Sequence, residues 1–217
     1  NKAPYVASTL ESVFSQDYTD YEIIVVDDGS TDESLEVLKS FGDKIHLIAQ
    51  PNRGASIARN EGVAAARGKY IAFLDADDLW LQGKLSQQVD FMESHPEVVW
   101  CSINESVETP SKGGQPTNMP WDPEGDRWTV FPDWFEANIG QTPVCTPGMM
   151  VLRSVFEQVG HFDPALPAGQ DMDMWIRIAR EFPRYGYCYE PMVHVRTSCP
   201  AASPGAGSRS DGANWTT

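Results

Sequence analysis

The feature that most constrains the fold is a regular alternation of helical and strand-like segments over the first hundred residues. Apolar residues recur at helical spacing in residues 4–16, 32–40, 54–66 and 85–93. Short apolar runs without alternation lie between them, at 21–26, 45–49, 70–74 and 98–101. Such runs are typical of strands buried on both faces of a parallel sheet. The alternation therefore predicts an α/β fold, in which a mostly parallel twisted sheet is flanked by helices in a single domain.

The second half of the chain shows a weaker pattern. Residues 104–128 are rich in Pro, Gly, Asp and Ser, which predicts a long surface loop of the kind that often carries binding elements. We expect helices at 130–138, 154–159 and 171–182, a strand at 149–152, and an extended segment at 185–196. Residues 198–217 have little apolar content, and we expect this tail to be disordered.

Charge and composition exclude several classes of protein. The 217 residues include 31 acidic and 16 basic side chains, for a net charge of −15. Such a surface repels phosphate backbones, so we expect no nucleic-acid partner. An anionic nucleotide can still bind where a divalent cation bridges the two charges. No run approaches the roughly 20 apolar residues of a membrane helix. Four widely spaced cysteines predict neither a zinc site nor a redox motif, and are typical of a reducing cytosol.

Three carboxylates crowd into four residues where the run 70–74 ends. They belong to Asp75, Asp77 and Asp78. Like charges at this spacing repel each other, and Mg²⁺ or Mn²⁺ relieves the repulsion because both ions prefer oxygen ligands together with substrate phosphates. A solvated acidic loop, with Asp78 capping the next helix, accounts for the same residues. Ligands of open α/β sheets bind beyond the carboxyl ends of the strands, which favours the functional interpretation.

A second acidic pair, Asp27 and Asp28, follows the run 21–26. A carboxylate here can accept hydrogen bonds from a ribose hydroxyl or a base N–H. The backbone N–H groups at the start of the next helix can face a phosphate. A simple cap on that helix is the alternative, and the pair taken alone favours the cap.

Two further positions are candidates on local grounds. Arg59 lies in the helix that leads to the Asp75 strand, where a guanidinium can pair with a diphosphate. A solvated helix face is the alternative for Arg59. Asp171 lies at the start of the helix 171–182, where the helix macrodipole favours a carboxylate. It is therefore either a helix cap or a general base that deprotonates an acceptor hydroxyl, and nothing local decides between the two.

Taken together, these segments resemble the family 2 glycosyltransferases, which adopt the GT-A fold. Residues 21–32 (YEIIVVDDGSTD) are similar to the nucleotide-binding strand and loop of that family. Residues 52–60 resemble the helix that follows, and residues 68–78 resemble the D-x-D segment. Residues 160–163 and 170–175 resemble the acceptor-side stretch. The five motifs occur in the family's order, and the resemblance extends from residue 1 to about residue 196.

The resemblance implies a role for each acidic candidate. Asp27 or Asp28 would contact the nucleoside of the donor. Asp75 would lie near the ribose or the diphosphate, and Asp77 would ligate Mg²⁺ or Mn²⁺. Asp171 would remove the acceptor proton during in-line attack, while the metal neutralises the departing diphosphate. One displacement of this kind inverts the anomeric configuration.

The implied activity is transfer of a sugar from a nucleotide-diphosphate donor, expected to be a UDP-sugar, to a hydroxyl of a glycan, lipid-linked or other acceptor. Bacterial surface-glycan synthesis uses such enzymes. The resemblance implies one domain over 1–197, with a nucleotide-sugar-binding half at 1–101 and an acceptor-side half at 102–197. We expect a cytoplasmic enzyme, and leave peripheral association with a membrane surface and the oligomeric state open.

Two alternatives to an active transferase remain. One is a non-catalytic or truncated module that binds nucleotide sugars. The other is a sugar nucleotidyltransferase, which usually carries a Gly-rich basic loop near its start, and this sequence has none there.

The sequence departs from the family pattern at three places. Relatives begin with an apolar strand, usually central in the sheet, that ends in Pro-x-Tyr-Asn, whereas this sequence opens at Asn1. We therefore expect that strand to be missing, which would leave unpaired edges on both neighbours. Gln170 replaces the usual Glu. The residues from Arg196 onward supply no His where many relatives have one that helps bind metal, and His194 comes too early.

Overall fold

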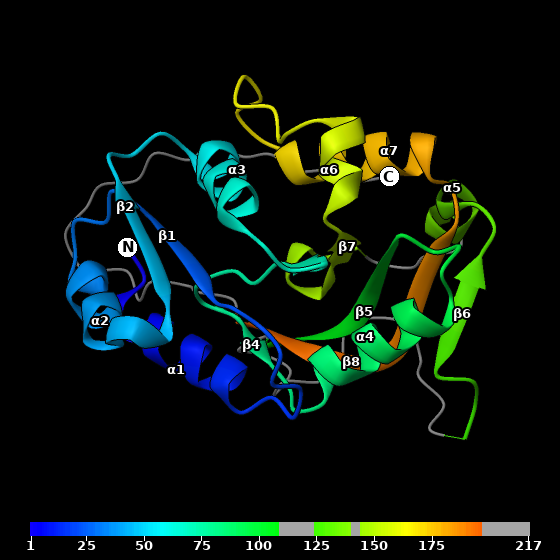
Figure 1. Ribbon diagram of the computed structural model, residues 1–217, viewed down its shortest axis with the longest axis horizontal. Helices are drawn as coiled ribbons and strands as arrows, with labels where there is room; N and C mark the ends of the chain where they lie inside the picture. The colour runs from blue at the N-terminus through cyan, green and yellow to red at the C-terminus, as the bar shows by residue number, and fades with distance from the viewer. Residues whose placement is uncertain (109–123, 140–143, 197–217) are drawn as a thin grey trace, which may run out of the picture.

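The computed structural model describes residues 1–108, 124–139 and 144–196 of the chain. Their strands form two sheets (Figure 1). A two-stranded sheet pairs β1 (Ile24–Asp28) with β2 (His46–Gln50) in parallel. A six-stranded sheet has the order β3-β7-β5-β8-β4, with β6 paired to β8 outside this path. The predicted disordered tail, 198–217, lies outside the described residues.

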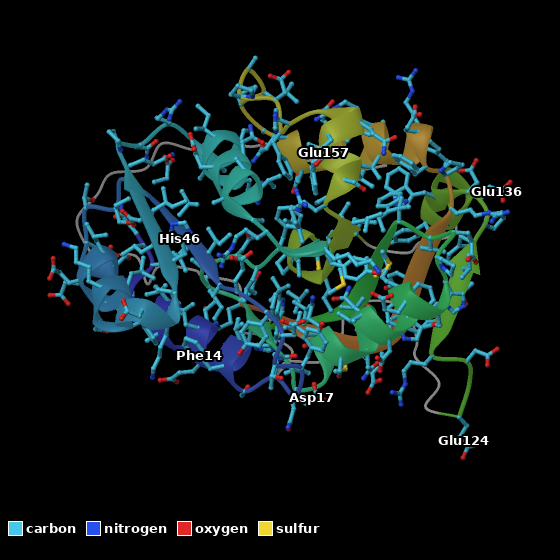
Figure 2. The ribbon with its side chains drawn as sticks, viewed as in Figure 1. Phe14, Asp17, His46, Glu124, Glu136 and Glu157 are labelled. Atoms are coloured by element: carbon cyan, nitrogen blue, oxygen red, sulfur yellow. The ribbon has the colours of Figure 1, made fainter. Side chains whose placement is uncertain are left out.

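Helices α1 (Ala3–Phe14) and α2 (Ser34–Ser40) pack together beside the two-stranded sheet. Their apolar stripes bury a small core with the strands, made of Val6, Leu10, Leu38 and Ile45. The rings of Phe14 and Phe41 stack at a centroid distance of 5.9 Å and close one end of this core. Figure 2 shows Phe14 of α1 and His46 of β2 on the left, far from Glu136 of α5 (Trp134–Ile139) on the right.

The six-stranded sheet separates two larger cores. One face carries α6 (Ser154–Val159) and α7 (Gln170–Glu181), whose buried side chains include Phe156, Trp175 and Ile178. The other face carries α4 (Lys84–Ser94), which buries Leu85, Phe91 and Met92. Figure 1 shows α6 and α7 in the upper part of the view, and α4 in the lower part, where it overlaps β8. The apolar side chains whose spacing predicted these helices are the ones that the helices bury.

The prediction of a mostly parallel sheet is wrong for the larger sheet, which is mixed. Strand β7 (Met150–Leu152) runs antiparallel to both of its neighbours, β3 (Tyr70–Ala72) and β5 (Trp100–Glu108). Of the described pairings in this sheet, only β5 with β8 (Tyr185–Arg196) is parallel. Parallel neighbours need a crossover helix, and the helix–strand alternation that would supply one ends at about residue 101. After that point β6 and β7 pair antiparallel with their neighbours, whereas β8 lies parallel to β5.

Three shorter elements differ from the sequence prediction. Residues 104–108 belong to β5, so the expected loop at 104–128 begins later, and its residues 109–123 lie outside the described residues. Strand β6 (Trp128–Phe131) occupies the start of the predicted helix 130–138, and α5 follows it. The Trp128 ring stacks on Phe91 at 4.1 Å, a tertiary contact that local propensity does not encode. Strand β4 (Leu79–Trp80) has two residues, too few for a periodic signal.

Helix α3 (Ala55–Ala65) connects the two sheets. The side-chain amide of Asn60 pairs with the backbone of Phe162: its Oδ1 accepts from the Phe162 N–H at 2.8 Å, and its Nδ2 donates to the Phe162 carbonyl at 2.9 Å. Ser56 donates to the carbonyl of Asp163 at 3.0 Å. These bonds fix α3 against the segment that leads to α7. None of the helices in the described part of the chain is long and apolar enough to cross a bilayer.

Candidate functional site

Residues Asp75–Asp78, here called the acidic loop, follow β3 and lead into β4. Their three carboxylates point to three different partners. Asp75 Oδ1 lies 3.3 Å from Arg59 Nη2, and Asp77 Oδ2 lies 2.5 Å from Lys2 Nζ. Asp78 Oδ1 accepts a hydrogen bond from the backbone N–H of Arg196 at 3.0 Å. Each carboxylate of the acidic loop therefore has its own cationic or N–H partner.

Arg196 also holds the backbone of the acidic loop. Its Nε donates to the carbonyl of Asp77, and its Nη1 and Nη2 donate to Ser8 Oγ and Thr9 Oγ1 at 3.0 Å each. The guanidinium lies 5.1 Å from the centre of the Tyr5 ring. Arg196 is the last residue of β8. It links β8, α1 and the acidic loop in one network.

The polar face of α1 continues this network. Thr9 Oγ1 donates to the carbonyl of Ala76 at 3.0 Å, and Ser12 Oγ accepts from the Trp80 N–H at 3.1 Å. Gln16 donates to the Leu81 carbonyl at 2.9 Å. Thr9 and Ser12 lie one turn apart on α1, beside its apolar stripe, and Gln16 follows two residues after the helix ends. The three side chains Thr9, Ser12 and Gln16 therefore fix the backbone that leads from the acidic loop into β4.

Asp78 is the most buried member of the acidic loop, with 4% of its surface exposed. Burial raises the pKa of Asp78 to about 7, against the opposing hydrogen bond from the Arg196 N–H, and repulsion from Asp75 and Asp77 adds to the rise. Asp78 faces inward and serves the loop's structure, and it does not cap the following helix, whose cap is Gly83. The neighbouring carboxylate, Asp77, is less buried, with 16% of its side chain exposed.

Asp27 and Asp28 end β1 and order the turn that follows it. Asp27 is buried, and its Oδ2 accepts from the Ser30 N–H at 3.2 Å. Asp28 accepts from Gln50 Nε2 at 2.7 Å and from the N–H groups of Arg53 and Gly54, each at 2.8 Å. Partial burial raises the pKa of Asp28, but these three donors outweigh it and hold the pKa below its ordinary value. Asp28 is thus ionised, and its carboxylate binds the backbone of the loop that precedes α3.

Arg59 projects from α3 towards the acidic loop. One guanidinium nitrogen, Nη2, faces Asp75, and the group lies 5.7 Å from the centre of the Phe162 ring. The other nitrogen, Nη1, is buried and has no hydrogen-bond partner among the residues that the structure describes. A buried N–H donor without a partner is costly, and an anion that reached it would remove the cost. The side chain is therefore available for a phosphate oxygen without losing its contact with Asp75.

Asp171 lies in the first turn of α7, which follows β7 and α6 in the sequence. Its Oδ2 accepts from the Thr146 hydroxyl at 3.2 Å. Thr146 opens the short 3-10 turn Thr146–Gly148, whose Pro147 carbonyl accepts from Trp80 Nε1 at 2.9 Å. That turn leads into β7, where Met150 pairs with Ala72 at the carboxyl end of β3. Asp171 and the acidic loop therefore lie at the same end of the sheet.

Divalent metal binding has to be judged from these side chains. Among the described residues, no three His, Cys, Asp or Glu side chains gather into a ready-made metal centre. Mg²⁺ and Mn²⁺ sites that act on nucleotides commonly use one or two protein carboxylates, with water and substrate phosphates as the other ligands. Asp77, partly exposed on a fixed loop and paired with Lys2 Nζ at 2.5 Å, could supply one such carboxylate. The residues present are compatible with a metal that arrives with a diphosphate.

The sequence named the acidic loop, the pair Asp27 and Asp28, Arg59 and Asp171 as candidates, but it did not indicate three residues that contact them. Lys2, Thr146 and Arg196 reach the site through contacts that span 25 to 119 residues of sequence. No local pattern marks such partners. The one available signal was in α1, where Thr9 and Ser12 keep helical spacing beside the apolar stripe.

A comparison with protein-family models decides the identity. The model described as glycosyl transferase family 2 matches residues 1–160. The chain belongs to this family. A UDP-Glc:alpha-D-GlcNAc-diphosphoundecaprenol beta-1,3-glucosyltransferase of Escherichia coli is 42% identical over 91 residues, which cover 41% of this chain and 36% of that protein. The curated relatives that this chain matches are longer than the chain, and the matched region spans 25% to 56% of their length.

Two solved structures share the fold. Staphylococcus aureus TarS 1–349 in complex with UDP superimposes with a TM-score of 0.74 at 18% identity, covering 91% of this chain and 58% of that one. The mannosyltransferase PcManGT of Pyrobaculum calidifontis, in complex with GDP-Man and Mn²⁺, gives a TM-score of 0.64 at 22% identity, covering 93% and 55%. The expected GT-A-like α/β fold of this glycosyltransferase-family chain is confirmed.

Proposed function

We propose that this family 2 domain transfers a sugar from a UDP-sugar to a hydroxyl acceptor, with inversion at the anomeric carbon. The observation that carries the proposal is the meeting of two kinds of group at one end of the sheet. Donor-type groups are supplied by the acidic loop, Arg59 and the loop after β1. A candidate base, Asp171, reaches the same end through Thr146 and β7.

Each donor-side residue has a distinct task in this proposal. Asp27 and Asp28 take the nucleoside end, because Asp28 is ionised and lies in the loop beside β1. Arg59 takes the diphosphate, since its Nη1 is a buried donor with no partner in the described part of the chain. Asp75 lies between the ribose and the diphosphate. Asp77 holds Mg²⁺ or Mn²⁺, which when bound neutralises charge on the leaving diphosphate.

The chemical step then follows from the positions of the acceptor and of Asp171. The Asp171 carboxylate takes the proton from the acceptor hydroxyl. The hydroxyl oxygen forms a bond to the anomeric carbon as the bond from that carbon to the diphosphate oxygen breaks. Arg59 stabilises the negative charge that the departing diphosphate keeps. A single displacement on the face opposite the leaving group inverts the configuration.

Two named proteins support the choice of donor and acceptor class. The E. coli relative is named for a UDP-Glc donor and a diphosphoundecaprenol-linked acceptor, and TarS was solved with UDP. We infer a UDP-sugar donor and a role in bacterial surface-glycan synthesis for this protein. A lipid-linked acceptor would bring the protein to the cytoplasmic face of a membrane as a peripheral enzyme.

The proposal is tested by incubating the protein with UDP-sugars, Mn²⁺ and a diphosphate-lipid-linked hexosamine, and following products by NMR. We expect a product whose anomeric configuration is opposite to that of the donor. Asp171→Asn should lower turnover at least about a hundredfold while leaving UDP affinity within about twofold. Asp43→Asn, at an exposed position away from the site, should change neither. Retained configuration, or full turnover by Asp171→Asn, would contradict the mechanism. UDP binding without any turnover would favour a binding module.

A further inference from the structure

A short turn joins the candidate base to the core of the large sheet. Thr146, Pro147 and Gly148 form this 3-10 turn, here called the base turn, and all three are buried. The Thr146 hydroxyl donates to Asp171 Oδ2 at 3.2 Å. Gly148 lies against β5, where an added Cβ would meet the Ile103 carbonyl oxygen at 2.6 Å. The place of the Asp171 carboxylate therefore depends on how the base turn is held.

Two carbonyl groups of the base turn accept hydrogen bonds from side chains. The last carbonyls of a short helical turn lack N–H partners within the turn itself. Trp80 Nε1 donates to the Pro147 carbonyl at 2.9 Å, and Gln88 Nε2 donates to the Gly148 carbonyl at 2.9 Å. Both bonds are buried, so the loss of either donor would leave a carbonyl group unpaired in the core.

Lys84 orients both of these donors. Its Nζ donates to Gln88 Oε1 at 2.5 Å, which leaves the NH₂ end of the Gln88 amide to face the base turn. The same Nζ lies 4.1 Å from the centre of the Trp80 ring. Lys84 and Gln88 are fully buried, and Trp80 belongs to the apolar core beneath α4. Apolar side chains would fill this space without the cost of burying polar groups.

Trp80 also connects the base turn to the acidic loop. It is the second residue of β4 and lies two positions after Asp78. Its backbone N–H donates to Ser12 Oγ at 3.1 Å, and Thr9 of the same helix donates to the Ala76 carbonyl. The backbone of Trp80 is therefore fixed together with the acidic loop, while its ring N–H holds the base turn.

We propose that Trp80 and Gln88 are positioning residues for Asp171. They hold the base turn by its last two carbonyl groups, and the Thr146 hydroxyl in turn holds the Asp171 carboxylate. The base then keeps a fixed place relative to a sugar donor bound at the acidic loop. This inference rests on the proposed role of Asp171, and it adds two residues that contact neither donor nor acceptor.

The test measures kcat, the KM for the UDP-sugar and the affinity for UDP in a set of variants. Trp80→Phe removes the ring N–H, and Thr146→Val removes the hydroxyl that holds Asp171. Each change should lower kcat by about tenfold and leave the KM and the UDP affinity within about twofold. Thr146→Ser keeps the hydroxyl and should keep kcat within about twofold of the parent.

Trp100→Phe is the matched control. Trp100 is buried, and its Nε1 donates to the Phe182 carbonyl at 2.9 Å, at the opposite end of α7 from Asp171. Loss of this bond should lower the melting temperature as Trp80→Phe does, yet leave kcat within about twofold. An equal fall in kcat in Trp100→Phe and Trp80→Phe would overturn the proposal, because the loss would then follow stability and not the position of the base.

The double variant, Trp80→Phe with Thr146→Val, tests whether both residues act through the base turn. Its kcat should fall by no more than about tenfold, because both changes interrupt the same set of contacts. A fall of about a hundredfold would show two independent effects and would also overturn the proposal.

If Trp80→Phe does not fold, benzothienylalanine at position 80 takes its place, with the same expected fall in kcat. This tryptophan analogue keeps the shape of the ring and carries sulfur in place of the N–H. A parent protein that transfers no sugar would overturn the proposed function and this inference with it. Transfer by the parent, with kcat unchanged in the forms altered at position 80, would overturn this inference alone.

Discussion

At the scale of single residues, the site is held together by side chains that a sequence pattern does not reveal. The acidic loop was predictable because three carboxylates in four residues at a strand end require a cationic partner. The partners were not predictable. Arg196 lies 119 positions from Asp77, and its role depends on how β8 and α1 pack.

Arg196 gives the sharpest prediction at this scale. Arg196→Met should lower the Mn²⁺-dependent affinity for UDP by about tenfold, because the Asp77 carbonyl, Ser8 and Thr9 lose the donor that fixes the acidic loop. Arg196→Lys should recover part of the loss, since a lysine can reach one acceptor but not three. Isothermal titration with UDP, with and without Mn²⁺, measures both effects. A uniform loss of metal-free and metal-dependent affinity would mean that Arg196 serves folding only.

At the scale of elements, helices were predicted better than strands. Helices α1, α3, α4 and α7 carry apolar stripes long enough to show a period, and each appears within a few residues of its expected bounds. Strand β4 has two residues and β6 has four, and both are defined by pairing with β8, far along the chain. The mixed direction of the large sheet likewise depends on β7 entering between β3 and β5. Pairing between distant strands leaves no local trace in the sequence.

Helix α4 contains a buried lysine, Lys84, whose described contacts with Gln88 and Trp80 include no carboxylate. Lys84 is fully buried, donates to Gln88 Oε1 at 2.5 Å and lies 4.1 Å from the centre of the Trp80 ring. Burial lowers the pKa of Lys84 to about 7, with weaker opposing effects of the Cys101 and Cys145 thiols. Unfolding exposes the amine and returns its pKa towards 10.5, so the unfolded chain binds more protons between these values.

The Lys84 contribution to the free energy of unfolding should therefore rise with pH between about 7 and about 10.5, by at most about 1.4 kcal/mol per pH unit. Lys84→Met keeps the volume and removes the titration. We expect the difference in unfolding free energy between Lys84→Met and the parent, measured by urea denaturation, to favour the variant most near pH 7 and to shrink towards pH 10. Lys44→Met, at an exposed position, should show no such trend. A pH-independent difference for Lys84→Met would contradict the assignment.

At the scale of the whole molecule, both sheets contribute to the candidate site, because Asp27 and Asp28 end β1 and the acidic loop follows β3. Helix α3 joins them, since its Asn60 and Ser56 bind the segment before α7 while Arg59 faces the acidic loop. The sequence predicted the α/β class and the position of the site beyond the strand ends. It did not predict that the sheets stay separate in these residues, although the expected loss of a central strand implied open edges.

The central claim is that the acidic loop binds a nucleotide through a divalent cation held by Asp77. The most direct test is calorimetric titration of UDP into the protein with Mn²⁺ and with a chelator, for the parent, Asp77→Asn and Asp43→Asn. We predict that Mn²⁺ strengthens UDP binding at least about tenfold in the parent and in Asp43→Asn, and that Asp77→Asn loses this gain. Equal Mn²⁺-dependent affinity in Asp77→Asn and the parent would contradict the account.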